Sequence, residues 1–178
     1  MNTENQYDAI AERYDSLFND KASIKENEQV AKMLCHVQTP VMDIGCGTGL
    51  LIDLLSVMDN EYIGVDPSAK MLEQFRHKHP KHKSVNIPFE WLNPSQVNYR
   101  TAVALFGSAS YIRENALRSL PRRRRLFLMF YKEDYHPVTY ERSGHELKHY
   151  SYSRRKLYDM FPQCRIKDFG NYYIVTNV

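Results

Sequence analysis

The sequence has few cysteines and little that would bind a metal. Cys35, Cys46 and Cys164 are its only thiols in 178 residues, and their scattered spacing fits neither a disulfide framework nor a zinc site. Three of the seven histidines gather in the basic segment 77–82 without an acid or thiol beside them, a poor match to a metal-ligand set. We therefore expect neither disulfides nor a metal.

Long apolar runs are also missing. No stretch approaches the ~20 consecutive apolar residues of a membrane-spanning helix, and the polar start Met1–Asn5 lacks the apolar core of a secretion signal. Linker-like segments, internal repeats and low-complexity tracts are absent as well. The length suits one domain, so we expect a single domain over residues 1–178, a cytoplasmic location and no membrane partner. Nothing in the pattern indicates an oligomeric state.

Charge is unevenly distributed along the chain. The net charge is +3, but residues 1–90 carry a net −5 and residues 91–178 a net +8, which includes the run Arg122–Arg125. The positive charge of residues 91–178 is explained either by this run together with chance or by binding of an acidic substrate or RNA. We favour the first explanation, and the role of the run stays open.

Apolar periodicity predicts an α/β fold. Residues 7–18 and a helix capped by Ser23 have helical spacing and precede any strand, so residues 1–39 are expected to form a helical cap. Strands are then predicted at 41–44, 61–65, 84–91, 100–108, 126–131, 164–169 and 172–176, with helices at 50–58, 67–75, 114–120 and 153–161. The strand 84–91 is weakened by Pro88 and is expected at an edge of the sheet, and Asp66 is expected to cap the helix that begins at Pro67. Residues 40–178 would thus form a doubly wound, mostly parallel sheet, with an antiparallel strand added by the C-terminal hairpin.

The stretch Val41–Leu50 is a strand that runs into a glycine-rich turn and a helix. Glycine lets backbone N–H groups approach a ligand closely, and the ligand of such a sheet lies at the carboxyl ends of its strands. A dinucleotide fingerprint would need glycine where Leu50 stands. Asp66, after the second strand, can hold both hydroxyls of a ribose, but a nicotinamide cofactor would use such an acid too. The glycine spacing, with Asp43 two residues before Gly45, is what distinguishes this motif from that of a nicotinamide-binding protein.

These motifs resemble those of class I S-adenosylmethionine (AdoMet)-dependent methyltransferases. Asp43–Gly49 is similar to the first motif of that family, and Tyr7–Asp15 to the Y-D-x-x-A-x-x-Y-D start of many small-molecule methyltransferases. Gly64–Ser68 with Met71 resembles the ribose and adenine motif, and Leu105–Tyr111 the end of the fourth strand. The resemblance implies in-line transfer of a methyl group from AdoMet to a small-molecule acceptor, giving S-adenosylhomocysteine.

The resemblance also implies a set of cofactor-binding residues: Tyr14, Asp43, Gly45, Cys46, Gly47, Asp66, Pro67, Met71, Glu90, Trp91 and Phe106. Two departures stand out. Glu90 takes the place of the acid that usually holds the adenine amino group, and Trp91 beside it either stacks on adenine or fills the core. In place of the family's usual P-G-G turn before the fifth strand, this chain has Pro121-Arg122-Arg123. This turn is expected at the amino ends of the strands, away from the cofactor.

The sequence says less about the residues that bind the methyl acceptor. Ser108, Tyr111 and His136 are candidates by position for contacting the substrate. A catalytic base cannot be identified, because methyl transfer from a sulfonium mainly needs positioning of the acceptor and exclusion of water. The segment Asn86–Phe89 is similar to the N-P-P-F loop of amino-methylating nucleic-acid enzymes, but that loop follows the fourth strand, whereas this segment belongs to the third. An RNA methyltransferase that uses the basic second half and a non-catalytic AdoMet-binding partner protein remain the alternatives.

Overall fold

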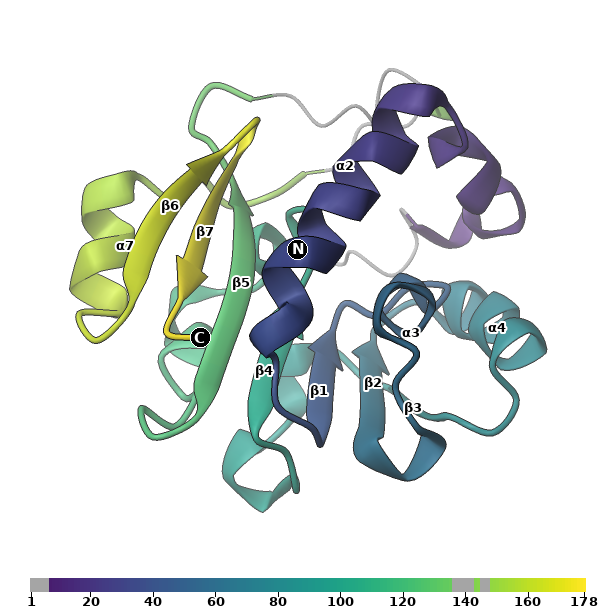
Figure 1. The fold of residues 1–178 in the computed structure, drawn as a ribbon, viewed down its shortest axis with the longest axis horizontal. Coiled ribbons are helices and arrows are strands. Elements are labelled where there is room, and N and C mark those ends of the chain that lie inside the picture. Colours follow the sequence, from purple (N-terminus) through teal and green to yellow (C-terminus); the bar gives the residue numbers. More distant parts are fainter. Residues whose placement is uncertain (1–6, 136–142, 145–147) are drawn as a thin grey trace.

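The computed structural model describes residues 7–135, 143–144 and 148–178. Its centre is a seven-stranded sheet in the order β3-β2-β1-β4-β5-β7-β6 (Figure 1). The strands are β1 (Val41–Ile44), β2 (Tyr62–Asp66), β3 (Lys83–Asn86), β4 (Thr101–Ala104), β5 (Arg125–Tyr131), β6 (Arg165–Phe169) and β7 (Tyr172–Thr176). Strands β1 to β5 are parallel, and the β6–β7 hairpin joins β5 antiparallel. The predicted doubly wound sheet with its antiparallel hairpin is confirmed.

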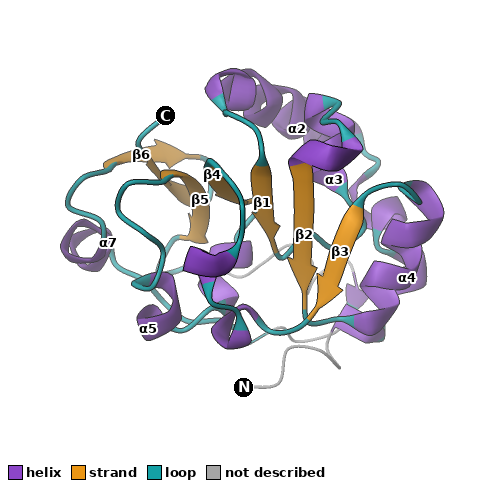
Figure 2. Cartoon of the chain, turned by 90° about the horizontal axis from the view of Figure 1, so that it is seen from below, coloured by secondary structure: helices purple, strands orange, loops and turns teal. Residues whose placement is uncertain are grey.

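Helices cover both faces of this sheet (Figure 2). The α-helices are α2 (Lys21–Met33), α3 (Leu50–Leu55), α4 (Ala69–Lys78), α5 (Glu114–Leu117) and α7 (Arg154–Met160). Short 3₁₀ helices are η1 (Ala11–Arg13), η2 (Asp15–Phe18), η3 (Leu34–His36), η4 (Asp59–Glu61), η5 (Phe89–Trp91), η6 (Pro94–Gln96) and η7 (Ser108–Tyr111). Apolar side chains of α2, α3 and α4 pack on one face of the sheet, and those of α5 and α7 on the other.

The middle strands are buried on both sides. Every residue of β1 and of β4 is buried, as expected for a parallel sheet between two helical layers. In β5, Leu128 and Phe130 face the layer of α5 and α7, while Phe127 and Met129 face that of α2 and α3. Strand β3 lies at the edge, as its weak sequence pattern predicted.

Several local predictions were wrong. The strand predicted at 84–91 ends at Asn86 and is followed by η5, and the strand predicted at 100–108 ends at Ala104. The helix α2 is capped by Asp20, whose carboxylate accepts from the N–H groups of Ala22 and Ser23, so the cap lies three residues before the predicted Ser23. Residues 11–18 form the two 3₁₀ helices η1 and η2 in place of one continuous helix. The helix after the glycine turn ends at Leu55 instead of reaching residue 58, because Ser56 adopts a left-handed conformation with φ 50°.

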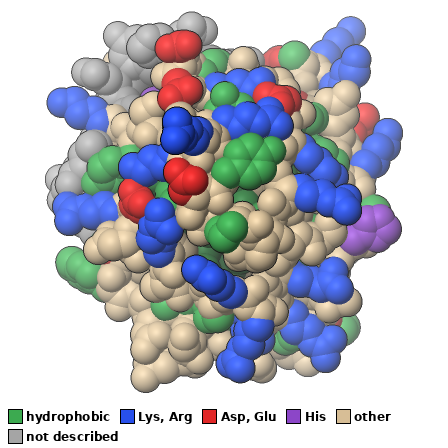
Figure 3. All heavy atoms as spheres, turned by 90° about the vertical axis from the view of Figure 1, so that its left-hand side faces the viewer, with side chains coloured by type: hydrophobic (Ala, Val, Ile, Leu, Met, Phe, Trp, Pro, Cys, Tyr) green, Lys and Arg blue, Asp and Glu red, His purple; other side chains and the backbone are tan. Residues whose placement is uncertain are grey.

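The arginine run lies at the amino ends of the strands, as predicted. Arg125 pairs with Thr101 at the start of β4, and the guanidinium of Arg124 stacks over the ring of Tyr99 at 4.9 Å from the centroid. Figure 3 shows the face that is turned to the left in Figure 1, where Lys and Arg side chains are numerous. No helix in the described part of the chain is long and apolar enough to span a membrane.

Candidate functional site

The glycine turn brings the backbone of β1 into close contact with its neighbours. Gly45, Gly47 and Gly49 all have positive φ, at 71°, 52° and 100°, a region that side chains with a Cβ rarely adopt. A Cβ on Gly45 would lie 2.8 Å from the side chain of Ser108. The N–H of Gly45 donates to the carbonyl of Val65 at 2.8 Å, which fixes the turn against β2.

Asp66, the last residue of β2, is held against this turn. Its carboxylate accepts from the N–H of Gly47 at 2.9 Å and from the N–H of Ser68 at 2.8 Å. Burial raises the pKa of Asp66 to about 6, although these two N–H groups oppose the shift. The predicted role of Asp66 as a helix cap, with Pro67 as the first helical residue, was wrong: α4 is capped by Ser68, whose Oγ accepts from the N–H of Met71 at 3.0 Å.

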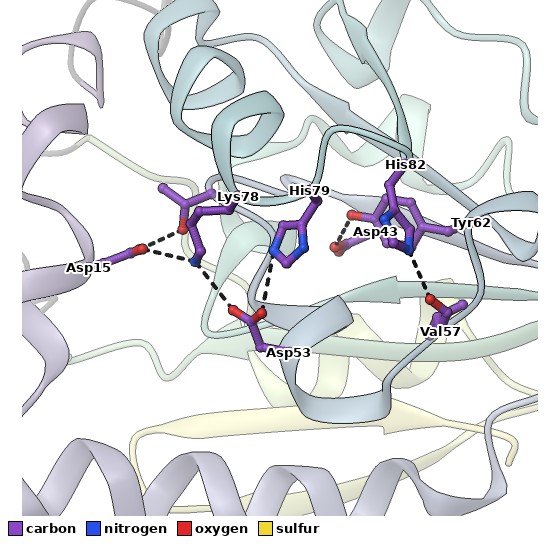
Figure 4. Close-up of polar contacts among 9 residues, drawn as sticks. Asp15, Asp43, Asp53, Val57, Tyr62, Lys78, His79 and His82 are labelled. Atoms are coloured by element: carbon purple, nitrogen blue, oxygen red, sulfur yellow. Dashed lines mark hydrogen bonds and ion pairs between the residues drawn. The ribbon is translucent and has the colours of Figure 1, made fainter.

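Asp43 lies at the foot of the same turn and is almost fully buried. Its carboxylate accepts a hydrogen bond from the hydroxyl of Tyr62 at 2.8 Å (Figure 4). Burial raises the pKa of Asp43 to about 7, while the Tyr62 hydroxyl partly lowers it. Asp43 and Asp66 thus place two desolvated carboxyl groups at one end of the turn.

A first pocket opens over the glycine turn at the carboxyl ends of the strands. It contains about 960 Å³ of empty space, part of it open to solvent. Ten of the eleven cofactor-binding residues expected from the sequence line it: Tyr14, Asp43, Gly45, Cys46, Gly47, Asp66, Pro67, Met71, Glu90 and Phe106. Two of the three acceptor candidates, Ser108 and Tyr111, line it too, and the third, His136, lies outside the described residues.

Trp91 is the exception among the expected residues. It lies on η5 with 77% of its surface exposed and is absent from the pocket lining, so it neither stacks into the pocket nor fills the core. Its neighbour Glu90 does reach the pocket rim, where its carboxylate accepts from the N–H of Arg113 at 3.0 Å. The segment Asn86–Phe89 begins with the last residue of β3 and leads into η5, so it lies at the end of the third strand and not after the fourth.

The N-terminal segment is fastened over this pocket by two aspartates. Asp8 accepts from the Oγ of Ser68 at 2.5 Å and from the N–H of Lys70 at 3.2 Å. Asp15 accepts from the Oγ1 of Thr48 at 2.6 Å and pairs with Lys78 at 2.9 Å (Figure 4). The sequence did not predict these contacts of Asp8 and Asp15, although both residues belong to Tyr-Asp pairs of the start motif Tyr7–Asp15.

Two of the three histidines of segment 77–82, His79 and His82, pack edge to face with ring centroids 5.7 Å apart. His79 lies 3.4 Å from the carboxylate of Asp53, and Nε2 of His82 lies 2.8 Å from the carbonyl of Val57 (Figure 4). Within the residues that the structure describes, no three His, Cys, Asp or Glu side chains are placed to hold a metal ion.

A second pocket adjoins the first and was not predicted from the sequence. It contains about 940 Å³ of empty space, again partly open. Its walls come from segments that are far apart in the chain: Tyr14, Asp15, Phe18, Ser23, Glu26, Asn27, Thr48, Leu50, Asp53, Lys78, Phe106, Tyr131, Tyr135 and Tyr172. Four of these also line the first pocket: Tyr14, Thr48, Leu50 and Phe106.

Residues 41–125, which include the glycine turn, Asp66 and the end of β4, match the family model described as a methyltransferase domain. This segment of the chain carries a methyltransferase domain. A curated relative, the uncharacterized protein MJ1252 of Methanocaldococcus jannaschii, is 31% identical over 124 residues, which is 68% of this chain and 47% of that protein. The chain therefore spans about half the length of this relative.

Solved methyltransferase structures share the fold of the whole chain. A SAM-dependent methyltransferase of Thermotoga maritima, described as a possible histamine N-methyltransferase, has a TM-score of 0.71 at 17% identity and covers 98% of each chain. Magnesium protoporphyrin IX methyltransferase of Synechocystis PCC 6803, solved with bound SAM, has a TM-score of 0.66 at 16% identity and covers 97% of this chain and 93% of its own. At these identities the likeness establishes the fold.

Tyrosines of this methyltransferase domain meet where its two pockets join. The rings of Tyr7 and Tyr111 are 5.7 Å apart, those of Tyr7 and Tyr14 6.0 Å, and those of Tyr111 and Tyr131 6.2 Å. Burial raises the pKa of all four hydroxyls. At neutral pH they are therefore protonated and can donate hydrogen bonds, so Tyr111 and Tyr131 are poorly suited to act as bases.

Proposed function

We propose that this protein binds AdoMet in the first pocket and transfers its methyl group to a small-molecule acceptor, releasing S-adenosylhomocysteine. The observation that carries the proposal is Asp66, a buried carboxylate at the end of β2 that is bound to the N–H of Gly47 in the glycine turn. This is where a ligand of an open α/β sheet binds, and a carboxylate there can hold two ribose hydroxyls. We also propose that residues 1–178 act as one domain, since the cap forms part of both pockets.

The residues present fit the cofactor. The backbone at Gly45 and Gly47 would receive its amino-acid part. Each oxygen of Asp66 accepts one N–H and keeps a lone pair for a ribose hydroxyl. Met71 and Glu90, further along the lining, would border the adenine, and Tyr14 would lie over the cofactor from the cap. The magnesium protoporphyrin IX methyltransferase of the same fold was solved with SAM bound, which supports this assignment.

AdoMet supplies a methyl group that is already activated by the positive charge of its sulfonium. The chain's own residues need only hold the acceptor in line with that methyl group and exclude water. The cap excludes water, because Asp8 and Asp15 hold it over the glycine turn. The protonated tyrosines at the junction can orient an acceptor by donating hydrogen bonds.

A small molecule is the better acceptor than RNA. The second pocket is lined by the cap and by strand ends of the same chain, whereas the run Arg122–Arg125 lies at the amino ends of the strands, opposite the pockets. An RNA methyltransferase would show salt-dependent RNA binding that is lost when this run is replaced by alanine.

Titration calorimetry with S-adenosylhomocysteine and AdoMet tests the binding step. We expect affinities in about the micromolar range that is common for substrates, and absence of binding would overturn the proposal. Labelled methyl transfer into a metabolite extract tests the reaction. Binding without any labelled product would favour a non-catalytic AdoMet-binding partner protein instead.

A further inference from the structure

The second pocket has an aromatic lining. Among the described residues, six aromatic side chains line it: Tyr14, Phe18, Phe106, Tyr131, Tyr135 and Tyr172. Tyr14 and Phe18 of the cap form one pair, with ring centroids 5.2 Å apart. Tyr131 lies 5.5 Å from both Tyr135 and Tyr172, and Tyr172 lies 6.0 Å from Phe106. The faces of such rings carry partial negative charge and attract cations.

The charged side chains of this pocket are mostly acidic. Asp15, Glu26 and Asp53 line it together with one cation, Lys78. Lys78 is already bound to Asp15 at 2.9 Å and to Asp53 at 3.2 Å, so its charge is compensated within the wall. Among the described residues of the lining, three carboxylates therefore stand against one ammonium group. A partly enclosed site of this sign favours positive charge in its ligand.

The end of β4 forms the boundary between the two pockets. Phe106 lines both and has φ 46°, a left-handed conformation that is rare for a bulky residue. Backbone strain of this kind is often found at functional sites. Gly107 follows at φ 85°, and a Cβ there would lie 2.2 Å from the ring of Tyr131. The β4 end is therefore packed directly against the aromatic wall of the second pocket.

We propose that the second pocket is the acceptor site and that the acceptor is an organic amine with an apolar or aromatic body. This inference rests on the proposed function, because it assigns the methyl acceptor of the same reaction. The aromatic walls would hold the apolar body, and the carboxylates would attract the nitrogen in its ammonium form. An acceptor that carries a carboxylate or phosphate would be repelled.

The charge balance of the transfer fits this assignment. An ammonium acceptor first loses one proton to water, which frees its nitrogen lone pair. That pair forms the new N–C bond while the C–S bond breaks and its electrons return to sulfur. Sulfur becomes neutral and the methylated nitrogen becomes cationic, so positive charge moves into the second pocket. Carboxylates and aromatic faces that are already in place stabilise charge that develops there.

The pair Glu26→Gln and Glu28→Gln tests the assignment on matched variants. Both glutamates are on α2, but Glu26 lines the second pocket, whereas Glu28 is exposed and lines neither. Each protein is first titrated with S-adenosylhomocysteine, which reports the proposed function separately. Benzylamine, charged at pH 7, and benzyl alcohol, neutral and of similar shape, are then titrated by NMR into the protein loaded with S-adenosylhomocysteine.

We expect the wild type to bind benzylamine about fivefold more tightly than benzyl alcohol, a difference of the size of a cation–aromatic contact. Glu26→Gln should remove most of this preference, and Glu28→Gln should keep it. Equal affinity for the two probes, binding of neither, or equal effects of the two variants would overturn the inference. If S-adenosylhomocysteine itself failed to bind, the proposed function would fail instead.

A second experiment examines the product. The protein is supplied with AdoMet labelled in its methyl group and with a metabolite extract, and the labelled products are fragmented by mass spectrometry. We expect the label on nitrogen. A label on oxygen, sulfur or carbon would overturn the inference while leaving the proposed methyl transfer intact.

Discussion

The two pockets of this protein are built by different means. The first is shaped by backbone: a glycine turn between β1 and α3, with Asp66 bound to the N–H of Gly47. The second is shaped by side chains from the cap, from α3 and α4, and from the ends of β4, β5 and β7. The backbone-built pocket matches a ligand that is common to a large family, whereas the side-chain-built pocket is the one we propose to select the acceptor. Changes in the two pockets should therefore have separable effects.

The largest expected effect is at Gly107, next to the boundary of the pockets. In Gly107→Ala the new Cβ would lie 2.2–2.5 Å from ring atoms of Tyr131, at φ 85°. We expect a loss of roughly 2–5 kcal/mol in the free energy of unfolding, from ~1–2 for the left-handed backbone and ~1–3 for overpacking. Denaturant unfolding measures it.

Gly170→Ala is the matched control for that change. Gly170 also has positive φ, at 50°, but a Cβ there would meet only a Glu26 oxygen at 3.8 Å, an ordinary contact. It should lose only the backbone part, about 1–2 kcal/mol. If both variants lost the same amount, Tyr131 would not be packed against Gly107 as described.

Asp66→Ala should damage the first pocket alone. We expect the affinity for S-adenosylhomocysteine to fall by about 1–3 kcal/mol, as for a lost charged hydrogen-bond partner, with benzylamine binding little changed. Calorimetry and NMR on the same sample give both values. Unchanged affinity for S-adenosylhomocysteine would show that Asp66 only fixes the turn and does not hold the ribose.

Asp43→Asn should change how stability depends on pH. The pKa of Asp43 is raised from 3.8 to about 7, so the native state holds this proton more tightly than the unfolded chain does. The stability gained from this is fully present below about pH 4 and is lost as the pH rises through about 7. Relative to Asp43→Asn, the wild type should therefore lose roughly 1–3 kcal/mol between pH 5 and pH 8, since one pKa unit corresponds to about 1.4 kcal/mol.

Unfolding curves at several pH values test this, with Asp59→Asn, an exposed acid outside both pockets, as the control for a lost charge. A constant difference between wild type and Asp43→Asn from pH 5 to pH 8 would contradict the buried setting of Asp43.

The smallest effect is expected outside both pockets. In Arg122→Ala/Arg123→Ala two exposed arginines at the amino ends of the strands are removed, while Arg124 keeps its contact with Tyr99. We expect no more than about a twofold change in affinity for S-adenosylhomocysteine or benzylamine, because exposed charges contribute little at a distance. Loss of methyl transfer would instead bring RNA back as an acceptor.

Much of the fold could be predicted because its signals are local. The apolar runs of β1, β4 and β5, the hairpin turn at Gly170-Asn171 and the Ser153 cap of α7 each depend on neighbouring residues only. The two capping errors arose where two nearby residues offered the same chemistry. Asp20 and Ser23 are both good caps, as are Asp66 and Ser68, and the choice depended on contacts with the rest of the fold. Asp66 was unavailable as a cap because its carboxylate is bound to Gly47.

The two pockets also differ in how far the sequence alone predicts them. The residues of the first pocket follow from motifs at strand ends, and only Trp91 lies outside it, because η5 turns that side chain toward solvent. The second pocket depends on long-range packing, which brings Glu26 of α2 and Tyr172 of β7 to one wall. No short segment contains that information, so the sequence alone did not reveal the pocket.

Tyr14 and Phe106 line both pockets, and this common wall has a thermodynamic consequence. A ligand that moves either ring in one pocket changes the shape of the other. The two binding equilibria are then linked, and the factor by which the first ligand changes the affinity of the second must equal the factor in the reverse direction. A measured affinity for either ligand is therefore a property of the occupancy of both pockets.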